Sequence, residues 1–268
     1  RMRLFGAMRR MSTTAEKLVT VEMKSSKVAI VRMNRPPVNA LSKDLMHGLR
    51  RTICDLEDND VKGIVLTSSS KVFCAGLDLA ELLNPTQEFV SSFWKELQGL
   101  WITLYSSRLV TVAAVNGAAP AAGCMLALSC DYRMMSSKNV IGMNETKFGL
   151  FPPPWFVELM ADTVGRRKAE MLLLQGTLLS TEDALACGMI DQIVESERLV
   201  DAACEYAEKV VKSTDRKAYQ TTKESLRARA TNDLLKIQEE EQRIFSQLFT
   251  SPNIQDKIAK YVESLKSK

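Results

Sequence analysis

The side chains that could do chemistry in this chain are carboxylates rather than histidines. The sequence contains one histidine, His47, inside an amphipathic stretch, so a Ser-His-Asp or Cys-His system would depend on that single residue. GxSxG and HExxH motifs are absent, and no GxxxxGK[ST] or GxGxxG loop follows a predicted strand, which disfavours nucleotide and nicotinamide enzymes. Acid–base catalysis would therefore rest on carboxylates, with Lys, Tyr and Cys as less favoured alternatives.

Two segments of small residues could supply what such a base needs, a pair of backbone amides that hold an oxyanion. Residues 74–79 (CAGLDL) follow a predicted strand, and residues 116–124 (NGAAPAAGC) lead from a strand into a helix. Small side chains let N–H groups approach a ligand, and the N–H groups of a helix N-terminus are free to bind it. Two such donors aimed at one point form an oxyanion hole. Each segment alone is also compatible with simple close packing.

These segments carry a resemblance to a known family. VFCAGLDL, followed further along by AVNGAAPAAGCMLALSCDYR, resembles the crotonase (enoyl-CoA hydratase/isomerase) superfamily over about residues 19–265. The segment IGMNETKFGLFPPPW is most similar to its mitochondrial Δ3,Δ2-enoyl-CoA isomerase branch. The resemblance implies that Glu145 is the catalytic carboxylate and that Leu77 and Ala122 provide the oxyanion amides. It further implies that the acyl-CoA is bound by Ala75, Gly76, Leu77, Asp78, Leu79 and Ala122.

Two positions bear on the reaction that the resemblance implies. Hydratases of the superfamily use two glutamates, one of them directly after the Gly-Cys of the second segment, where this chain has Met125. A thioether cannot transfer a proton, so an isomerase that works with one glutamate is favoured. Family members commonly carry glycine where this chain has Ala122, and the extra methyl group leaves the range of substrates open. Without the resemblance, a surface ion pair with Lys147 would be the favoured interpretation of Glu145.

The expected function is the conversion of 3-cis- or 3-trans-enoyl-CoA to trans-2-enoyl-CoA in fatty acid β-oxidation. Alternatives are a hydratase, a dienoyl-CoA isomerase, or a catalytically silent acyl-CoA-binding or RNA-associated member of the family. No metal or other cofactor is expected, since coenzyme A belongs to the substrate. The family implies a homotrimer. A net charge of +4 and 6% aromatic residues argue against a nucleic-acid partner, and no apolar run is long enough for membrane insertion.

The elements that must position these residues read as strand, strand, helix. Short β-branched runs at Val19–Met23 and Val28–Met33 predict a hairpin, and similar units recur as far as residue 197. From residue 198 onward the pattern is purely helical, with helices expected at 198–212, 215–229, 231–249 and 252–265. We expect an α/β fold, a crotonase-type spiral of ββα units over 18–197 with a helical oligomerisation region at 198–268.

Finer expectations concern individual segments. Gly63–Thr67 is expected to be a buried strand, with a further strand at Val72–Gly76, and Pro120 is expected to open a helix that ends near Cys130. A helix is also expected at Arg166–Gln175, and Ser42 and Ser180 are expected to cap the helices that follow them. Glu239–Glu241 is expected to lie on a solvated face. The aromatic residues Trp94 and Trp101 are expected mainly in the core, although they could also line an acyl tunnel. A second aromatic group is expected to be mainly core but could also line an acyl tunnel: Phe148, Phe151, Trp155 and Phe156.

The first residues suggest where the protein acts. The segment RMRLFGAMRRMSTTA contains four arginines and no acidic residue, a composition typical of a mitochondrial transit peptide, although a disordered basic tail fits as well. We therefore expect residues 1–17 to be a leader and the mitochondrial matrix to be the location. Six cysteines without a CxxC pair indicate neither a zinc site nor a disulfide framework.

Overall fold

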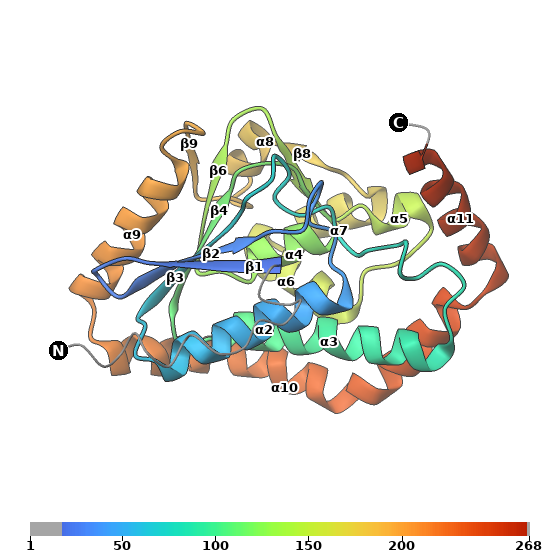
Figure 1. The fold of residues 1–268 in the computed structure, drawn as a ribbon, viewed down its shortest axis with the longest axis horizontal. Coiled ribbons are helices and arrows are strands. Elements are labelled where there is room, and N and C mark those ends of the chain that lie inside the picture. Colours follow the sequence, from blue (N-terminus) through green and yellow to red (C-terminus); the bar gives the residue numbers. More distant parts are fainter. Residues whose placement is uncertain (1–17, 267–268) are drawn as a thin grey trace.

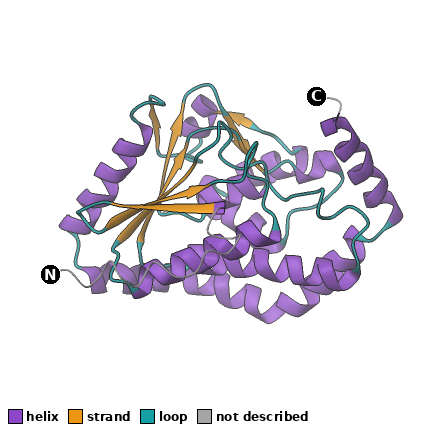
Figure 2. Ribbon diagram, in the orientation of Figure 1, coloured by secondary structure: helices purple, strands orange, loops and turns teal. Residues whose placement is uncertain are grey.

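The structure is a computed structural model that describes residues 18–266, so the expected leader at 1–17 lies outside the described residues. Its centre is a six-stranded sheet in the order β1-β2-β3-β4-β6-β9, in which β1 and β2 are antiparallel and the following pairs are parallel (Figure 2). The strands are β1 (Val19–Met23), β2 (Val28–Met33), β3 (Gly63–Ser68), β4 (Val110–Val115), β6 (Tyr132–Ser136) and β9 (Gln192–Val194). A small second sheet is formed by β5 (Ala119–Pro120), β7 (Val140–Gly142) and β8 (Leu179–Ser180).

Helices surround the main sheet, and α2, α3 and α10 run side by side along one edge of the molecule (Figure 1). The helices of the first two-thirds are α2 (Lys43–Asp58), α3 (Gln87–Tyr105), α4 (Ala122–Leu128), α5 (Glu145–Phe148), α6 (Pro154–Val164), α7 (Arg166–Gln175) and α8 (Thr181–Ala186). The C-terminal helices are α9 (Leu199–Ser213), α10 (Arg216–Phe249) and α11 (Pro252–Lys266). The side chains of Ser42 and Ser180 cap α2 and α8 by accepting from backbone amides, as the sequence predicted.

Both faces of the sheet are buried, which explains why its central strands are continuously apolar. In β2, Val31 and Met33 point into the main core with α2, α3 and α4, whereas Val28 and Ile30 point into a second cluster under α9. This alternation follows the two-residue period of a strand. The main core reaches the C-terminal helices through Phe245 and its neighbours.

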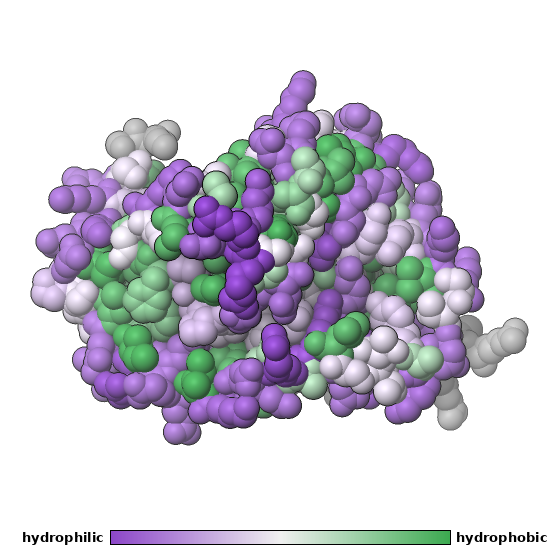
Figure 3. Space-filling view, turned by 180° about the vertical axis from the view of Figure 1, so that it is seen from behind, coloured by the Kyte–Doolittle hydropathy of each residue, from purple (hydrophilic) through white to green (hydrophobic). Residues whose placement is uncertain are grey.

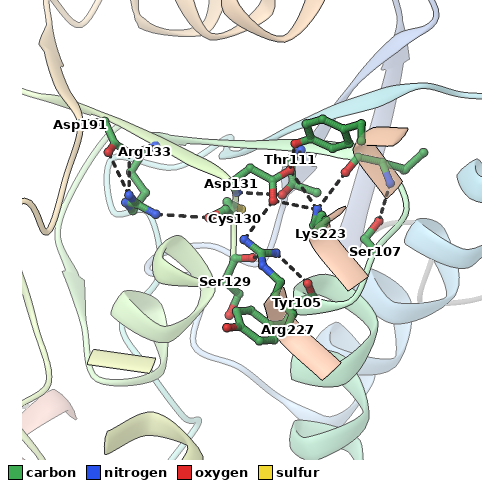
Figure 4. A network of polar contacts seen from close by, with 12 residues as sticks. Tyr105, Ser107, Thr111, Ser129, Cys130, Asp131, Arg133, Asp191, Lys223 and Arg227 are labelled. Atoms are coloured by element: carbon green, nitrogen blue, oxygen red, sulfur yellow. Dashed lines mark hydrogen bonds and ion pairs between the residues drawn. The ribbon is translucent and has the colours of Figure 1, made fainter. Parts of the chain in front are cut away.

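A buried ionic network holds α10 against the sheet (Figure 4). The Asp131 carboxylate pairs with Lys223 Nζ at 2.8 Å and with Arg227 Nη2 at 3.0 Å, and it accepts from Tyr219 Oη at 2.7 Å. Burial acts to raise the pKa of Asp131, but the two cations outweigh it and the pKa is lowered. Loss of one partner would leave a buried charge without compensation, which costs about 3–5 kcal/mol.

Three expectations about the elements were wrong. Residues 72–76 form no strand, and Leu77 makes a single β-bridge with Leu41. Pro120 lies in β5, and α4 begins two residues later at Ala122, because Ala121 adopts a positive φ of 51° that breaks the helical path. Residues 215–249 form one helix rather than two, since no glycine or proline interrupts them.

Candidate active site

A cavity of about 150 Å³ lies between the central elements and the C-terminal helices. Its lining combines small residues, one carboxylate and many aromatic rings. It is formed by Ala75, Leu77, Leu79, Trp94, Leu97, Ala121, Ala122, Asn144, Glu145, Phe148, Leu150, Phe151, Pro153, Phe156, Phe245, Phe249 and Tyr261. Residues of both small-residue segments and Glu145 therefore line the same cavity.

The segment around Leu77 is fixed on both sides while its own amide stays free. The Ala75 amide donates to Val38 O at 3.0 Å and the Asp78 amide donates to Leu41 O at 3.1 Å. No acceptor for the Leu77 amide occurs within residues 18–266. A buried amide without a protein partner is rare, so this N–H group is available to a ligand.

The second segment presents the amide of Ala122 in the same way. The Ala121 amide donates to Gly142 O at 2.8 Å, and the Met125 amide closes the first turn of α4 onto Ala121 O. Ala122 is the first residue of α4, so its N–H group has no partner inside the helix. The two segments touch, because a Cβ built on Gly76 would lie 3.7 Å from Ala122 N.

Glu145 is the first residue of the short helix α5, and its Oε2 is buried without a hydrogen-bond partner in the described part of the chain. The residue as a whole is partly exposed. Burial raises the pKa of Glu145 from 4.5 to about 7. Thr146 Oγ1 donates to Leu173 O at 3.0 Å and ties α5 to α7. The alternative of a surface ion pair with Lys147 is not seen among residues 18–266.

Only some of the remaining predicted site residues line the cavity. Leu79 lines the cavity, whereas Gly76 and Asp78 do not belong to its lining. Asp78 is buried and its carboxylate is paired with Arg35, while it also accepts from the Ala80 amide at 3.0 Å. This ion pair stabilises the turn after Leu77, and a direct contact of Asp78 with CoA stays a prediction.

Sequence reasoning missed the part of the lining that comes from the C-terminal helices. Phe245 and Phe249 on α10 and Tyr261 on α11 close the cavity. Trp94, which was expected mainly in the core, is buried and also lines the cavity. The four-residue spacing of Phe245 and Phe249 was a visible signal for one helix face, but nothing local said what that face would cover. His47 is exposed on α2, with 55% of its side chain accessible, as expected of a surface residue.

The backbone of Ala121 is strained, because φ of 51° with ψ of −123° suits glycine rather than alanine. We expect Ala121→Gly to raise the free energy of unfolding by about 1 kcal/mol, with the adjoining amide kept in place. Denaturant unfolding of the two proteins would measure this gain. An unchanged or lower midpoint would show that the backbone here is not strained.

The fold and the cavity define an α/β protein with a shielded carboxyl group and two free backbone amides in one cavity, a site suited to proton transfer beside a carbonyl. The chain belongs to the enoyl-CoA hydratase/isomerase family, whose model matches residues 23–268. This membership confirms the crotonase-type α/β fold expected from the sequence.

Relatives and solved structures of this family cover almost the whole chain. The chain is 36% identical over 259 residues to mouse "Enoyl-CoA delta isomerase 1, mitochondrial", covering 95% of this chain and 89% of that protein. The human protein of the same name is 36% identical over 243 residues, covering 89% and 80%. The crystal structure of human mitochondrial delta3-delta2-enoyl-CoA isomerase superposes with a TM-score of 0.90 at 34% identity, covering 93% of this chain and 98% of that one.

Among residues 18–266, no helix has the length and apolar character that crossing a bilayer requires. In the same part of the chain, no group of three or more His, Cys, Asp or Glu side chains is arranged to hold a metal ion. The expectation that the protein needs no cofactor stays a prediction.

Proposed function

We propose that this protein is a Δ3,Δ2-enoyl-CoA isomerase that converts 3-cis- and 3-trans-enoyl-CoA to trans-2-enoyl-CoA in fatty acid β-oxidation. The observation that carries the proposal is the shielded carboxyl group of Glu145 in the same cavity as the free amides of Leu77 and Ala122. The names of the mouse and human relatives support the same reaction.

In the proposed mechanism the thioester oxygen accepts hydrogen bonds from the amides of Leu77 and Ala122. These two donors stabilise the negative charge that gathers on the oxygen when a proton leaves C2, and each contributes a few kcal/mol. The Glu145 carboxylate takes that proton, and the C3–C4 double bond becomes conjugated with the enolate. The protonated Glu145 then delivers the proton to C4, so that the double bond lies between C2 and C3 and the carboxylate is restored.

Burial suits Glu145 to both halves of this cycle. A base with a pKa of about 7 is stronger than an ordinary carboxylate, and its conjugate acid is still acidic enough to protonate carbon C4 of the dienolate. Matching the pKa to the working pH favours both proton transfers. Because the cavity is mostly lined by apolar side chains, little else competes for the proton.

The lining also argues against hydration. Glu145 is the one acidic residue among those that line the cavity in the described part of the chain. Met125 stands where the resemblance places a second glutamate in hydratases, and it is fully buried. Water addition needs one group to activate water and another to deliver a proton to carbon, and this second group is missing from the lining.

A turnover assay tests the proposal. The protein is incubated separately with a 3-enoyl-CoA and with the corresponding trans-2-enoyl-CoA. We expect the first to be converted to the trans-2 isomer without a change in mass, and the second to gain no water. A product heavier by one water would identify a hydratase, and the absence of any conversion would identify a silent acyl-CoA-binding member.

The raised pKa of Glu145 also predicts how stability depends on pH. The folded pKa of about 7 exceeds the unfolded value of 4.5, so the protein loses stability as pH rises from the unfolded value through the folded one. Glu145→Gln removes this loss. We expect the variant to gain of order 2 kcal/mol in unfolding free energy relative to the wild type between about pH 5 and about pH 8. Denaturant unfolding at both pH values measures it; an equal difference at both would contradict the raised pKa.

Location and assembly belong to the same proposal. We place the protein in the mitochondrial matrix, which the word "mitochondrial" in the names of its relatives supports. The homotrimer stays a prediction. Apolar side chains such as Leu226, Leu235 and Leu174 are exposed, and on the face seen in Figure 3 apolar residues reach the surface in separate patches among hydrophilic ones. Sedimentation analysis of the purified chain would give the number of subunits.

A further inference from the structure

Glu241 on α10 is a buried carboxylate that the mechanism does not use. Residues Glu239–Glu241 were expected to lie on a solvated face, and for Glu241 this expectation was wrong, because the residue is 3% exposed. Its Oε2 accepts three hydrogen bonds, and its Oε1 is buried without a partner in the described part of the chain. The donors are Trp94 Nε1 at 3.0 Å, Gln98 Nε2 at 2.7 Å and Trp155 Nε1 at 2.9 Å. A buried carboxylate without a cation is costly, so its position calls for an explanation.

One of these hydrogen bonds, from Trp94 Nε1 to Glu241 Oε2, fixes the ring of Trp94, which lines the cavity. Phe245 follows Glu241 by one helical turn on α10 and stacks on Trp94, with ring centroids 3.7 Å apart and planes 11° apart. The indole is thus held at its N–H edge by Glu241 and on its face by Phe245. Both rings line the cavity, whereas Glu241 is absent from the lining and lies behind them.

We propose that the Trp94–Phe245 pair, held in place by Glu241, is the closed end of the acyl pocket and restricts the protein to short acyl chains. Glu241 is a positioning residue that acts through Trp94. This inference rests on the proposed function, since it names the class of acyl-CoA that the same site accepts.

The size of the cavity supports a short chain. A cavity of about 150 Å³ matches the volume of an apolar protein cavity that takes up benzene, which corresponds to on the order of six carbon atoms. Trp94 and Phe245 are each 2% exposed, so protein covers them from behind and a longer tail cannot pass between them. Phe151, in contrast, is 45% exposed, and a tail directed past it would leave the protein for water.

This arrangement predicts a break in affinity along a series of saturated acyl-CoAs. Each methylene that enters the pocket should strengthen binding about fourfold. Once the pocket is filled as far as the Trp94–Phe245 wall, further methylenes must turn past Phe151 into water, and each should add almost nothing. We expect the rise to end after on the order of six carbons. Equilibrium binding of butanoyl- to hexadecanoyl-CoA measures this profile. Saturated acyl chains cannot isomerise, so the measurement is independent of turnover.

Three variants test the wall formed by Trp94 and Phe245. Phe245→Leu shortens the wall and should move the break to chains about two carbons longer, which corresponds to binding of those chains about sixteenfold tighter than in the wild type. Glu241→Leu leaves three donors without an acceptor and frees Trp94, so the break should move in the same direction. Glu241→Gln keeps one acceptor oxygen and should retain the wild-type break.

Lys223→Met is the matched control for Glu241→Leu. This change removes the buried ion pair between Lys223, on the same helix α10, and Asp131, and neither residue lines the cavity (Figure 4). It should lower stability and leave the chain-length profile unchanged. With 3-enoyl-CoA substrates, Glu241→Leu should raise KM for hexenoyl-CoA about tenfold with kcat within about threefold, a split that general destabilisation does not produce.

The outcomes separate this inference from the proposed function. A wild-type affinity that keeps rising to hexadecanoyl-CoA, or a Phe245→Leu profile parallel to the wild type, would overturn the closed pocket. An equal shift of the break in Lys223→Met and Glu241→Leu would overturn the positioning role of Glu241. A break that moves as expected in a protein that converts no 3-enoyl-CoA would support the wall and refute the isomerase.

Discussion

Glu145→Gln is expected to lower kcat for 3-enoyl-CoA by roughly 10³-fold or more, while the affinity for saturated acyl-CoA stays within about threefold of the wild type. Glutamine has the shape of the glutamate and fits the same space beside α5, but its amide cannot accept the proton from C2. Because one side chain is proposed for both proton transfers, its loss removes both steps. Steady-state kinetics together with equilibrium binding measure the two quantities.

A matched control guards against a general effect of losing a glutamate. Glu158 lies on α6, pairs with Arg166 at 2.9 Å on the surface and does not line the cavity, so Glu158→Gln should keep nearly full activity. If Glu145→Gln retained more than about a tenth of the wild-type kcat, general acid–base catalysis by this residue would be ruled out. The proposed function would then lose its main support.

Much of the fold could be predicted from local signals. The hairpin β1–β2 and helix α7 were expected with the bounds that the structure shows, because alternation, turn residues and a terminal glycine are properties of neighbouring residues. Ser42 and Ser180 were recognisable as N-caps for the same reason. These elements depend little on what packs against them.

The elements that were mispredicted depend on distant partners. Residues 72–76 resemble a strand by composition, yet the Ala75 amide bonds to Val38 O and leaves no regular pairing. The positive φ of Ala121 is imposed by the packing of two loops, and no sequence rule assigns it to alanine. Glu241 looks solvated beside two other glutamates, but its partner Trp94 lies 147 positions away.

The candidate site, like the fold, could be predicted from the sequence only in part. The two small-residue segments stood out by their residue types and Glu145 through the family resemblance, and the structure brings them to one cavity. The wall of that cavity is made by Trp94, Phe245 and Phe249, whose types are ordinary for a core. These rings line the cavity because α10 packs against α3, and this packing is not visible in the local sequence.

Gly123→Ala is expected to lower kcat by about 10²- to 10³-fold through the geometry of the two amides. Gly123 is in α4, directly after Ala122, and a Cβ built on it would lie 2.2 Å from the backbone oxygen of Cys74. That oxygen belongs to the segment that carries Leu77, so the methyl group must push the two oxyanion segments apart. Overpacking of this kind also costs about 1–3 kcal/mol in unfolding free energy.

Gly99→Ala provides the comparison that isolates this effect. Gly99 lies in α3, where alanine is the better helix former by about 1 kcal/mol, and its Cβ would meet the Arg50 guanidinium at 3.0 Å, the mobile end of a long side chain. We expect Gly99→Ala to keep activity and stability, whereas Gly123→Ala loses both. Kinetics of the folded fraction, with unfolding followed in parallel, measure this. Because both changes add one methyl group to a buried helix, a folded Gly123→Ala protein with wild-type kcat would mean that the spacing of the Leu77 and Ala122 amides does not govern the reaction.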